Sequence, residues 1–223
     1  VINTRLGTDP VLYPNVDWMN EVFDDFGHNR RANINVIGGG QNVNYYASAS
    51  YYNEKGLIKT DPNESYDSKI GYTRYNFTTN LNINVTPTTK LDIGASGYLG
   101  EGRKPYESTS DIFRVAMTTS PVDYPVMFYV NVKDYIPYNQ PNSGFNNPYV
   151  GATKRGFRTV TDSQIYSNLR LTQDLGFITK GLSFTGMFAF DTYNSRTVKQ
   201  KKTESTYYWV DKNNPYDKYG FPI

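Results

Sequence analysis

The sequence predicts an all-β protein whose antiparallel strands form part of the wall of a transmembrane β-barrel. Three observations predict this fold class. Apolar and polar residues alternate along six segments, these segments are long for strands, and short and long connections follow one another in turn. The chain has 223 residues with 21 Tyr and 12 Phe, and its mean hydropathy is −0.63. It is therefore too polar to fill a large dry core and too rich in β-forming residues to be disordered.

Charge and cysteine content exclude several classes of function. The net charge is only +2 and no basic face stands out, so a nucleic-acid partner is not expected. The cationic run at 199–202 is interpreted as a solvated loop, as most charge runs are. The chain contains no cysteine, which excludes disulfides, thiolate catalysis and Cys-ligated metals within it.

Period-two alternation is the first observation, because it predicts strands with two unlike faces. The six predicted strands are 31–38, 42–54, 73–85, 90–100, 163–175 and 181–191. Their apolar positions should face lipid, while the Asn- and Ser-rich positions should face a polar lumen. Tyrosine also suits the membrane–water interface, where its ring is buried and its hydroxyl stays hydrated. The expected membrane-facing residues are Tyr45, Tyr51, Tyr75, Phe77, Leu81, Ile83, Phe184 and Phe188.

Strand length is the second observation. A globular strand usually has about 5–6 residues. A tilted membrane strand needs about 9–11. Most of the predicted strands fall near or above the membrane value, so their length favours a membrane barrel over a soluble sandwich.

The connections are the third observation. Tight turns at 38–41, 86–89 and 176–180 alternate with long connections, as in outer-membrane barrels with short periplasmic turns and long extracellular loops. The expected layout has hairpins at 28–54, 73–100 and 163–191 and extracellular loops at 1–27, 55–72, 101–162 and 192–223. Both chain ends then lie outside the cell, so further strands are expected before and after this chain.

Two more features support the view that the chain is a fragment. Its start, Val1-Ile2-Asn3, has no signal-peptide pattern, and no stretch is apolar enough for a membrane helix. A six-stranded piece would also leave two open edges, and unpaired backbone groups in lipid cost several kcal/mol each. We therefore expect that the chain does not fold as an independent unit.

One short helix is expected in the longest loop. Ser110 can cap it, Asp111 suits the positive helix N-terminus, and Ser120-Pro121 ends it. Its common face would consist of Ile112, Val115 and Ala116. Six prolines between 105 and 148 predict a fixed rather than a floppy loop.

No catalytic residues, metal site or cofactor are expected. His28 has no second metal-ligating neighbour in the sequence and is interpreted as structural. Asp61, Glu64 and Asp67 offer at most a weak calcium cluster. Loop acids such as Glu107 are better interpreted as exposed side chains than as a glycosidase pair.

Two groups of residues are candidates for binding. Tyr207, Tyr208 and Trp209 could stack on a sugar or peptide, or they could simply pack within the loop. Arg30 and Arg31 lie near the outer end of the first strand and could contact lipopolysaccharide phosphates. A solvated strand end explains these two arginines equally well.

Several segments resemble the SusC/RagA-like family of TonB-dependent outer-membrane transporters. The longest is Tyr13-Pro14-Asn15-Val16-Asp17-Trp18-Met19-Asn20-Glu21-Val22-Phe23, early in the chain. The others follow in order at 37–40, 45–48, 51–56, 72–81, 120–126, 147–149, 171–175, 179–184 and 190–191. No single piece is decisive, but their order and spacing are specific, and together they extend over nearly the whole chain.

The resemblance implies a barrel of roughly 22 strands with a plugged lumen. These residues would correspond to strands from the second to about the seventh, in the N-terminal half of the barrel. It also implies active import of oligosaccharides or peptides, a SusD-like surface lipoprotein over the outer loops, and a TonB complex that contacts an N-terminal segment outside these residues. Residues 207–209 could then dock that lipoprotein. A passive porin-like barrel and a soluble carbohydrate-binding β-protein remain the alternatives.

Overall fold

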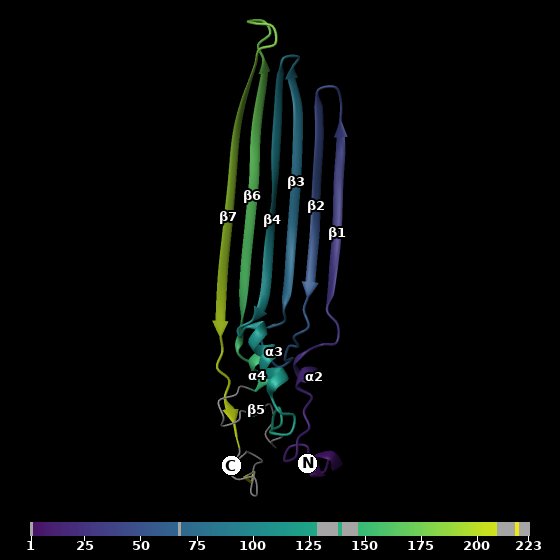
Figure 1. Ribbon diagram of the computed structural model, residues 1–223, viewed down its shortest axis with the longest axis vertical. Helices are drawn as coiled ribbons and strands as arrows, with labels where there is room; N and C mark the ends of the chain where they lie inside the picture. Colours follow the sequence, from purple (N-terminus) through teal and green to yellow (C-terminus); the bar gives the residue numbers. More distant parts are fainter. Residues whose placement is uncertain (1, 67, 129–137, 140–146, 209–216, 219–223) are drawn as a thin grey trace.

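Six long strands form one antiparallel sheet in the computed structural model, which describes residues 2–66, 68–128, 138–139, 147–208 and 217–218 (Figure 1). The sheet order is β1-β2-β3-β4-β6-β7, so each strand pairs with the next long strand along the chain. The strands are β1 (His28–Gly39), β2 (Val43–Lys55), β3 (Gly71–Thr86), β4 (Thr89–Pro105), β6 (Gly156–Asp174) and β7 (Ser183–Lys201). The predicted antiparallel strands are confirmed.

The register gives the sheet two continuous faces. On one, which we call the apolar face, Tyr51 pairs with Tyr75 and Ala49 with Phe77, and Leu169 pairs with Phe188 farther along the sheet. On the other, the polar face, Ser50 pairs with Asn76. Because side chains alternate along every strand, one register fixes both faces at once.

The apolar face carries the side chains that were expected to face a membrane. Tyr45, Tyr75 and Phe77 are 46%, 54% and 41% exposed, and Phe184 and Phe188 are 56% and 66% exposed. Tyr51, Leu81 and Ile83 are half-buried on the same face. The exposed apolar side chains are contiguous on this face, and contiguous exposed apolar patches are typical of surfaces that contact a membrane or another protein.

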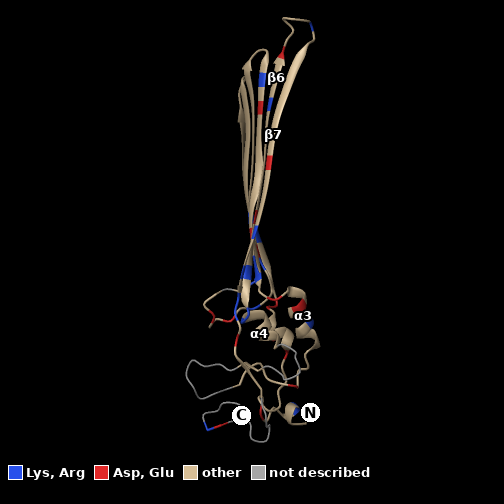
Figure 2. Cartoon of the chain, turned by 90° about the vertical axis from the view of Figure 1, so that its left-hand side faces the viewer, with Lys and Arg blue, Asp and Glu red and all other residues tan. Residues whose placement is uncertain are grey.

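Charged residues are most numerous toward one end of the sheet, and a smaller group lies near the turns (Figure 2). Seen from the side, the strands are long and twisted, and most of their length carries few charged residues (Figure 2). The helices and long connections lie together at the opposite end from the β1–β2, β3–β4 and β6–β7 turns (Figure 1). We call this the loop end.

Three strands reach farther toward the loop end than alternation predicted. β4 runs to Pro105, β6 starts at Gly156 and β7 runs to Lys201. The predicted loop bounds at 101–162 and 192–223 are therefore wrong. The interpretation of 199–202 as a solvated loop is also wrong, because Lys199–Lys201 pair with β6. Backbone pairing continues there although the side chains no longer alternate.

The predicted helix is present as α3 (Thr109–Thr118), but its cap is Ser108 rather than Ser110. The Asp111 amide donates a hydrogen bond of 3.1 Å to the Ser108 hydroxyl oxygen. Ile112 and Ala116 are buried, as their spacing predicted. The remaining helices are α1 (Ile2–Leu6), α2 (Trp18–Val22) and α4 (Pro148–Thr153). None of the described helices is long and apolar enough to cross a membrane.

The hydrophobic core lies at the loop end. It joins α2, α3, α4 and the segment after β2, and its buried members are Trp18, Val22, Ile58, Ile112, Ala116, Tyr124 and Ala152. The Trp18 indole nitrogen donates a hydrogen bond of 3.1 Å to the Ser120 carbonyl, and its ring lies 5.3 Å from that of Tyr124. The connections at the loop end are thus folded against one another in the described part of the chain, as the prolines predicted.

Candidate functional site at the loop end

A buried ion cluster fastens three distant segments together. Lys154, which follows α4, lies 2.8 Å from an Asp61 oxygen and 3.0 Å from a Glu64 oxygen. The side chains of Lys154, Asp61 and Glu64 are only 5%, 2% and 7% exposed. Lys202, just beyond β7, lies 2.7 Å from Glu64 and 2.9 Å from Glu204. The pairs of Lys154 are buried, so removal of one partner would leave an uncompensated charge, whereas Lys202 is 42% exposed.

Asp61 receives hydrogen bonds from several directions. The hydroxyls of Tyr138 and Tyr149 donate to one carboxylate oxygen at 2.7 and 3.0 Å, and the Asn63 amide donates to the other at 2.8 Å. Burial opposes the charged form, but the hydrogen bonds from Lys154, Asn63 and Tyr138 outweigh it and lower the pKa of Asp61 to about 2. Burial and the nearby Asp61 raise the pKa of both tyrosines.

The same contacts argue against the weak calcium cluster. Lys154 already pairs with one oxygen of Asp61 and one of Glu64, so a cation bound between these carboxylates would have to displace it. Asp67 lies outside the described residues. No signal within 55–72 could have shown this, since both cations come from more than 80 residues farther along the chain.

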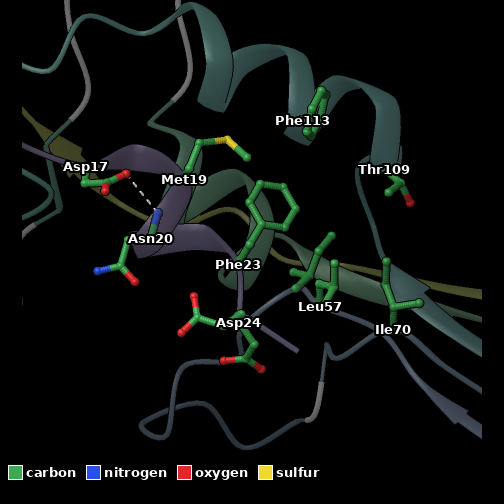
Figure 3. Close-up of a pocket in the computed structure, with 11 residues that line it drawn as sticks. Asp17, Met19, Asn20, Phe23, Asp24, Leu57, Ile70, Thr109 and Phe113 are labelled. Carbon is green, nitrogen blue, oxygen red and sulfur yellow. Dashed lines mark hydrogen bonds between the residues drawn. The ribbon is translucent and has the colours of Figure 1, made fainter. Parts of the chain in front are cut away.

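An apolar cleft opens beside the core (Figure 3). Its volume is about 600 Å³. Phe23 and Phe113 approach edge to face with ring centroids 6.0 Å apart, and Met19 lies close to them. Acidic side chains lie at the rim, where Asp24 pairs with Lys69 at 3.1 Å. The cleft is wide enough for an apolar side chain or a small ligand.

The aromatic trio is only partly described. Tyr207 belongs to β8 (Thr206–Tyr207), which pairs in parallel with β5 (Tyr138–Asn139), and it is half-buried. Tyr208 is 48% exposed, and Trp209 lies outside the described residues. The pairing of Tyr207 agrees with loop packing, whereas about half of the Tyr208 side chain is exposed.

The two arginines of β1 lie on opposite faces of the sheet. Arg30 pairs with Asn53 and shares the apolar face, while Arg31 pairs with Tyr52 on the polar face. The Arg31 guanidinium lies 5.4 Å from the centre of the Tyr52 ring. Only Arg30 is therefore placed toward the surface that lipid would contact. His28 begins β1 opposite Lys55, at the strand end where the sequence placed it.

Sequence reasoning missed α2, α4 and the ion cluster. Both helices carry a local signal, because Asp17 accepts a hydrogen bond from the Asn20 amide and Asn147 precedes Pro148 at the first turn. These caps could have been recognised as helix starts. The ion cluster had no such signal.

Comparison with known proteins supports the transporter resemblance. No protein-family model matches the chain. A curated protein from Formosa agariphila, TonB-dependent receptor P26, is 32% identical over 82 residues, which is 37% of this chain and 7% of that protein. Two solved structures share the fold. The RagAB peptide importer in its closed-closed state matches 92% of this chain and 21% of its own, with 19% identity and a TM-score of 0.57. A RagAB peptide transporter structure matches 82% and 19%, with 18% identity and a TM-score of 0.52.

The chain therefore spans about a fifth of the solved chains that it matches. The sequence similarity covers 37% of this chain, and the two solved structures share its fold over most of its length. In sequence and in fold, this chain resembles part of a SusC/RagA-like TonB-dependent transporter.

Proposed function

We propose that this chain forms part of the barrel wall of a TonB-dependent importer in the outer membrane of a Gram-negative bacterium. The observation that carries the proposal is the continuous apolar face across six paired strands, which leaves large rings such as Phe188 and Phe184 66% and 56% exposed. A soluble sheet would bury such a face against a second layer. A bilayer covers it instead.

The polar face suits a water-filled or plugged lumen. It carries Asn, Ser, Thr and Tyr rather than an apolar layer, as the interior of an outer-membrane barrel does. The edges of β1 and β7 would pair with further strands of the same barrel, because unpaired backbone groups are costly in lipid. The chain would then contribute to transport in two ways: the six-stranded sheet forms part of the barrel wall, and the loop end forms part of the entrance.

The loop end would lie outside the cell, with the short turns in the periplasm. Folded loops of this length are usually functional. The loop core and the ion cluster would hold the entrance in one shape against which a SusD-like surface lipoprotein could close. Tyr208 and Trp209 are candidate contacts for either that partner or the cargo.

We propose an oligosaccharide or a peptide as cargo. The RagAB proteins are a peptide importer, which supports a peptide. Exposed aromatic rings suit both classes, because flat rings stack on sugars as well as on peptide side chains. The chain would act through binding and passage, with no chemical step, so no enzymatic activity is assigned.

Transport assays test this function. In cells that depend on the whole transporter for growth on an oligosaccharide or peptide nutrient, uptake should stop when TonB is deleted or the proton gradient is collapsed. Uptake that continues without TonB would instead indicate a passive porin-like barrel. Recovery of the protein in the soluble fraction would indicate a soluble carbohydrate-binding β-protein.

A further inference from the structure

A hollow on the polar face combines two arginines with tyrosine rings. It has a volume of about 440 Å³ and lies across β1, β2 and β3. The lining residues on the polar face are Arg31, Asn33, Ser50, Tyr52, Tyr72, Arg74 and Asn76. Tyr51, whose side chain belongs to the apolar face, also borders the hollow. We call it the arginine–tyrosine hollow. The register brings its charged centre together, because Arg31 pairs with Tyr52 and Tyr52 pairs with Arg74.

The Arg74 side chain is held in place from two sides. Its guanidinium carbon lies 3.9 Å from the centre of the Tyr98 ring, close enough for a cation–π contact. Its Nε donates a hydrogen bond of 2.8 Å to Asn76, whose amide donates in turn to the Ser50 hydroxyl at 3.0 Å. Arg74 makes no other hydrogen bond within the described part of the chain, so its terminal nitrogens can face a ligand in a fixed orientation.

The charge of the hollow is unbalanced. Neither Arg31 nor Arg74 forms an ion pair with an acidic side chain in the described part of the chain. Glu54, the nearest acid along β2, accepts a hydrogen bond of 2.8 Å from the Tyr52 hydroxyl. Asp162 approaches from β6 beside Gly100, where it faces the Tyr72 hydroxyl. Two guanidinium groups thus line the hollow and no carboxylate does.

The hollow also lies close to the loop end. Tyr52 and Arg74 are each three residues from the end of their strand, which corresponds to about 10 Å along it. A molecule that passes from the loop end toward the turns along the polar face meets this hollow early. The position of the hollow therefore favours binding of a ligand that enters from outside. A permanent contact with another part of the protein would be expected deeper in the lumen.

From these observations we infer that the arginine–tyrosine hollow binds a carboxylate carried beside a flat or ring-shaped group of the cargo. Arginine recognises a carboxylate through two parallel hydrogen bonds, and the tyrosine rings offer stacking surfaces next to it. An acidic sugar and an acidic peptide both present this chemistry. The inference rests on the proposed function, because it takes the polar face as the lumen of an importer.

The test uses the whole transporter, purified in detergent, and four ligands. They are an oligogalacturonate, its neutral methyl ester, an acidic tripeptide with a C-terminal aromatic residue, and the same peptide with its carboxyl groups amidated. Arg74→Gln and Arg31→Gln remove the charges of the hollow. Arg30→Gln is the matched control, because it removes the same charge from the neighbouring position on the opposite face.

Binding of a carboxylate ligand should weaken about 10- to 100-fold in Arg74→Gln, as expected when a charge-assisted hydrogen bond is lost. Arg30→Gln should bind the carboxylate ligand like the wild type. The uncharged form of the same ligand, the methyl ester or the amidated peptide, should bind weakly to every variant. Tyr98→Phe should retain the affinity, whereas Tyr98→Ala should lose part of it because Arg74 loses its stacking partner. Preference for the sugar or for the peptide identifies the source of the carboxylate.

Three results would overturn the inference. The first is equal binding of the charged and neutral ligands by the wild type. The second is an equal loss in Arg30→Gln and Arg74→Gln. The third is unchanged binding in Arg74→Gln together with a lower melting temperature, which would assign the hollow to contact with another part of the protein. TonB-dependent growth, measured separately, decides whether the proposed function itself holds.

Discussion

Replacing Lys154 by methionine should loosen the whole loop end of this protein. The substitution keeps most of the side-chain volume but removes the charge between Asp61 and Glu64. Lys202 still pairs with Glu64, and the hydroxyls of Tyr138 and Tyr149 still donate to Asp61. Asp61 would keep hydrogen bonds but lose the cation that compensates its burial.

The expected cost follows from how deeply these groups are buried. Removal of one partner of a buried pair costs about 3–5 kcal/mol, because it leaves an uncompensated charge. The remaining contacts of Asp61 and Glu64 favour the lower end, about 3 kcal/mol of local stability. Since each 1.36 kcal/mol is a factor of ten, the open state should become roughly a hundredfold more populated.

Hydrogen exchange followed by mass spectrometry on the whole protein measures this directly. Backbone amides in 57–66 and 147–155 should lose about a hundredfold in protection in Lys154→Met. Arg114→Met is the control, because the Arg114–Asp111 pair is 59% and 56% exposed and such pairs contribute about 0.2–1 kcal/mol. Unchanged protection in Lys154→Met, or an equal change in both variants, would refute the reasoning.

Three further predictions concern the same account. The pKa of Asp61 is lowered from its usual 3.8 to about 2, which corresponds to a contribution of about 2 kcal/mol to loop-end stability. This contribution should be fully present above pH 4 and disappear as the pH falls from about 4 to 2. Hydrogen exchange measured across this range should show the loss, and a constant profile would contradict it. Trp18→Ala should destabilise the loop core by about 3–5 kcal/mol, seen as faster proteolysis of the outer connections while the strands stay protected. Phe188→Arg on the apolar face should lower barrel stability in lipid by about 2–4 kcal/mol, whereas Ala189→Arg on the polar face, opposite the uncharged Asn168, should be tolerated. Equal effects in a denaturant titration would show that the faces are assigned wrongly.

The strands could be predicted because alternation is a local property. The strand 73–85 alternates along most of its length, and the structure has β3 there. The end of β7 could not be found, because 192–201 has scattered apolar residues and is held as a strand only by its pairing with β6. Side-chain pattern predicts burial, whereas pairing also depends on the neighbouring strand.

The loop end shows where local reasoning fails. Ser108, Thr109 and Ser110 are all good helix caps, and only the path of the chain after β4 decides that Ser108 caps α3. Asp61 and Glu64 lie close in sequence and could be noticed, but Lys154 and Lys202 meet them only in the fold. Acidic residues without a visible partner were therefore interpreted as a weak cation site.

Spin-label accessibility along β2 tests the central claim, that the apolar face contacts lipid and the polar face does not. The 223 residues contain no cysteine, so single cysteines can be placed and labelled one at a time within this chain. In outer-membrane vesicles, labels at Tyr45, Ala47 and Ala49 should be accessible to oxygen dissolved in the bilayer, and labels at Tyr46 and Ser48 to a water-soluble nickel complex. Accessibility that alternates with a period of two in this sense is the predicted result. Equal access of the nickel complex to both sets of positions would contradict the account.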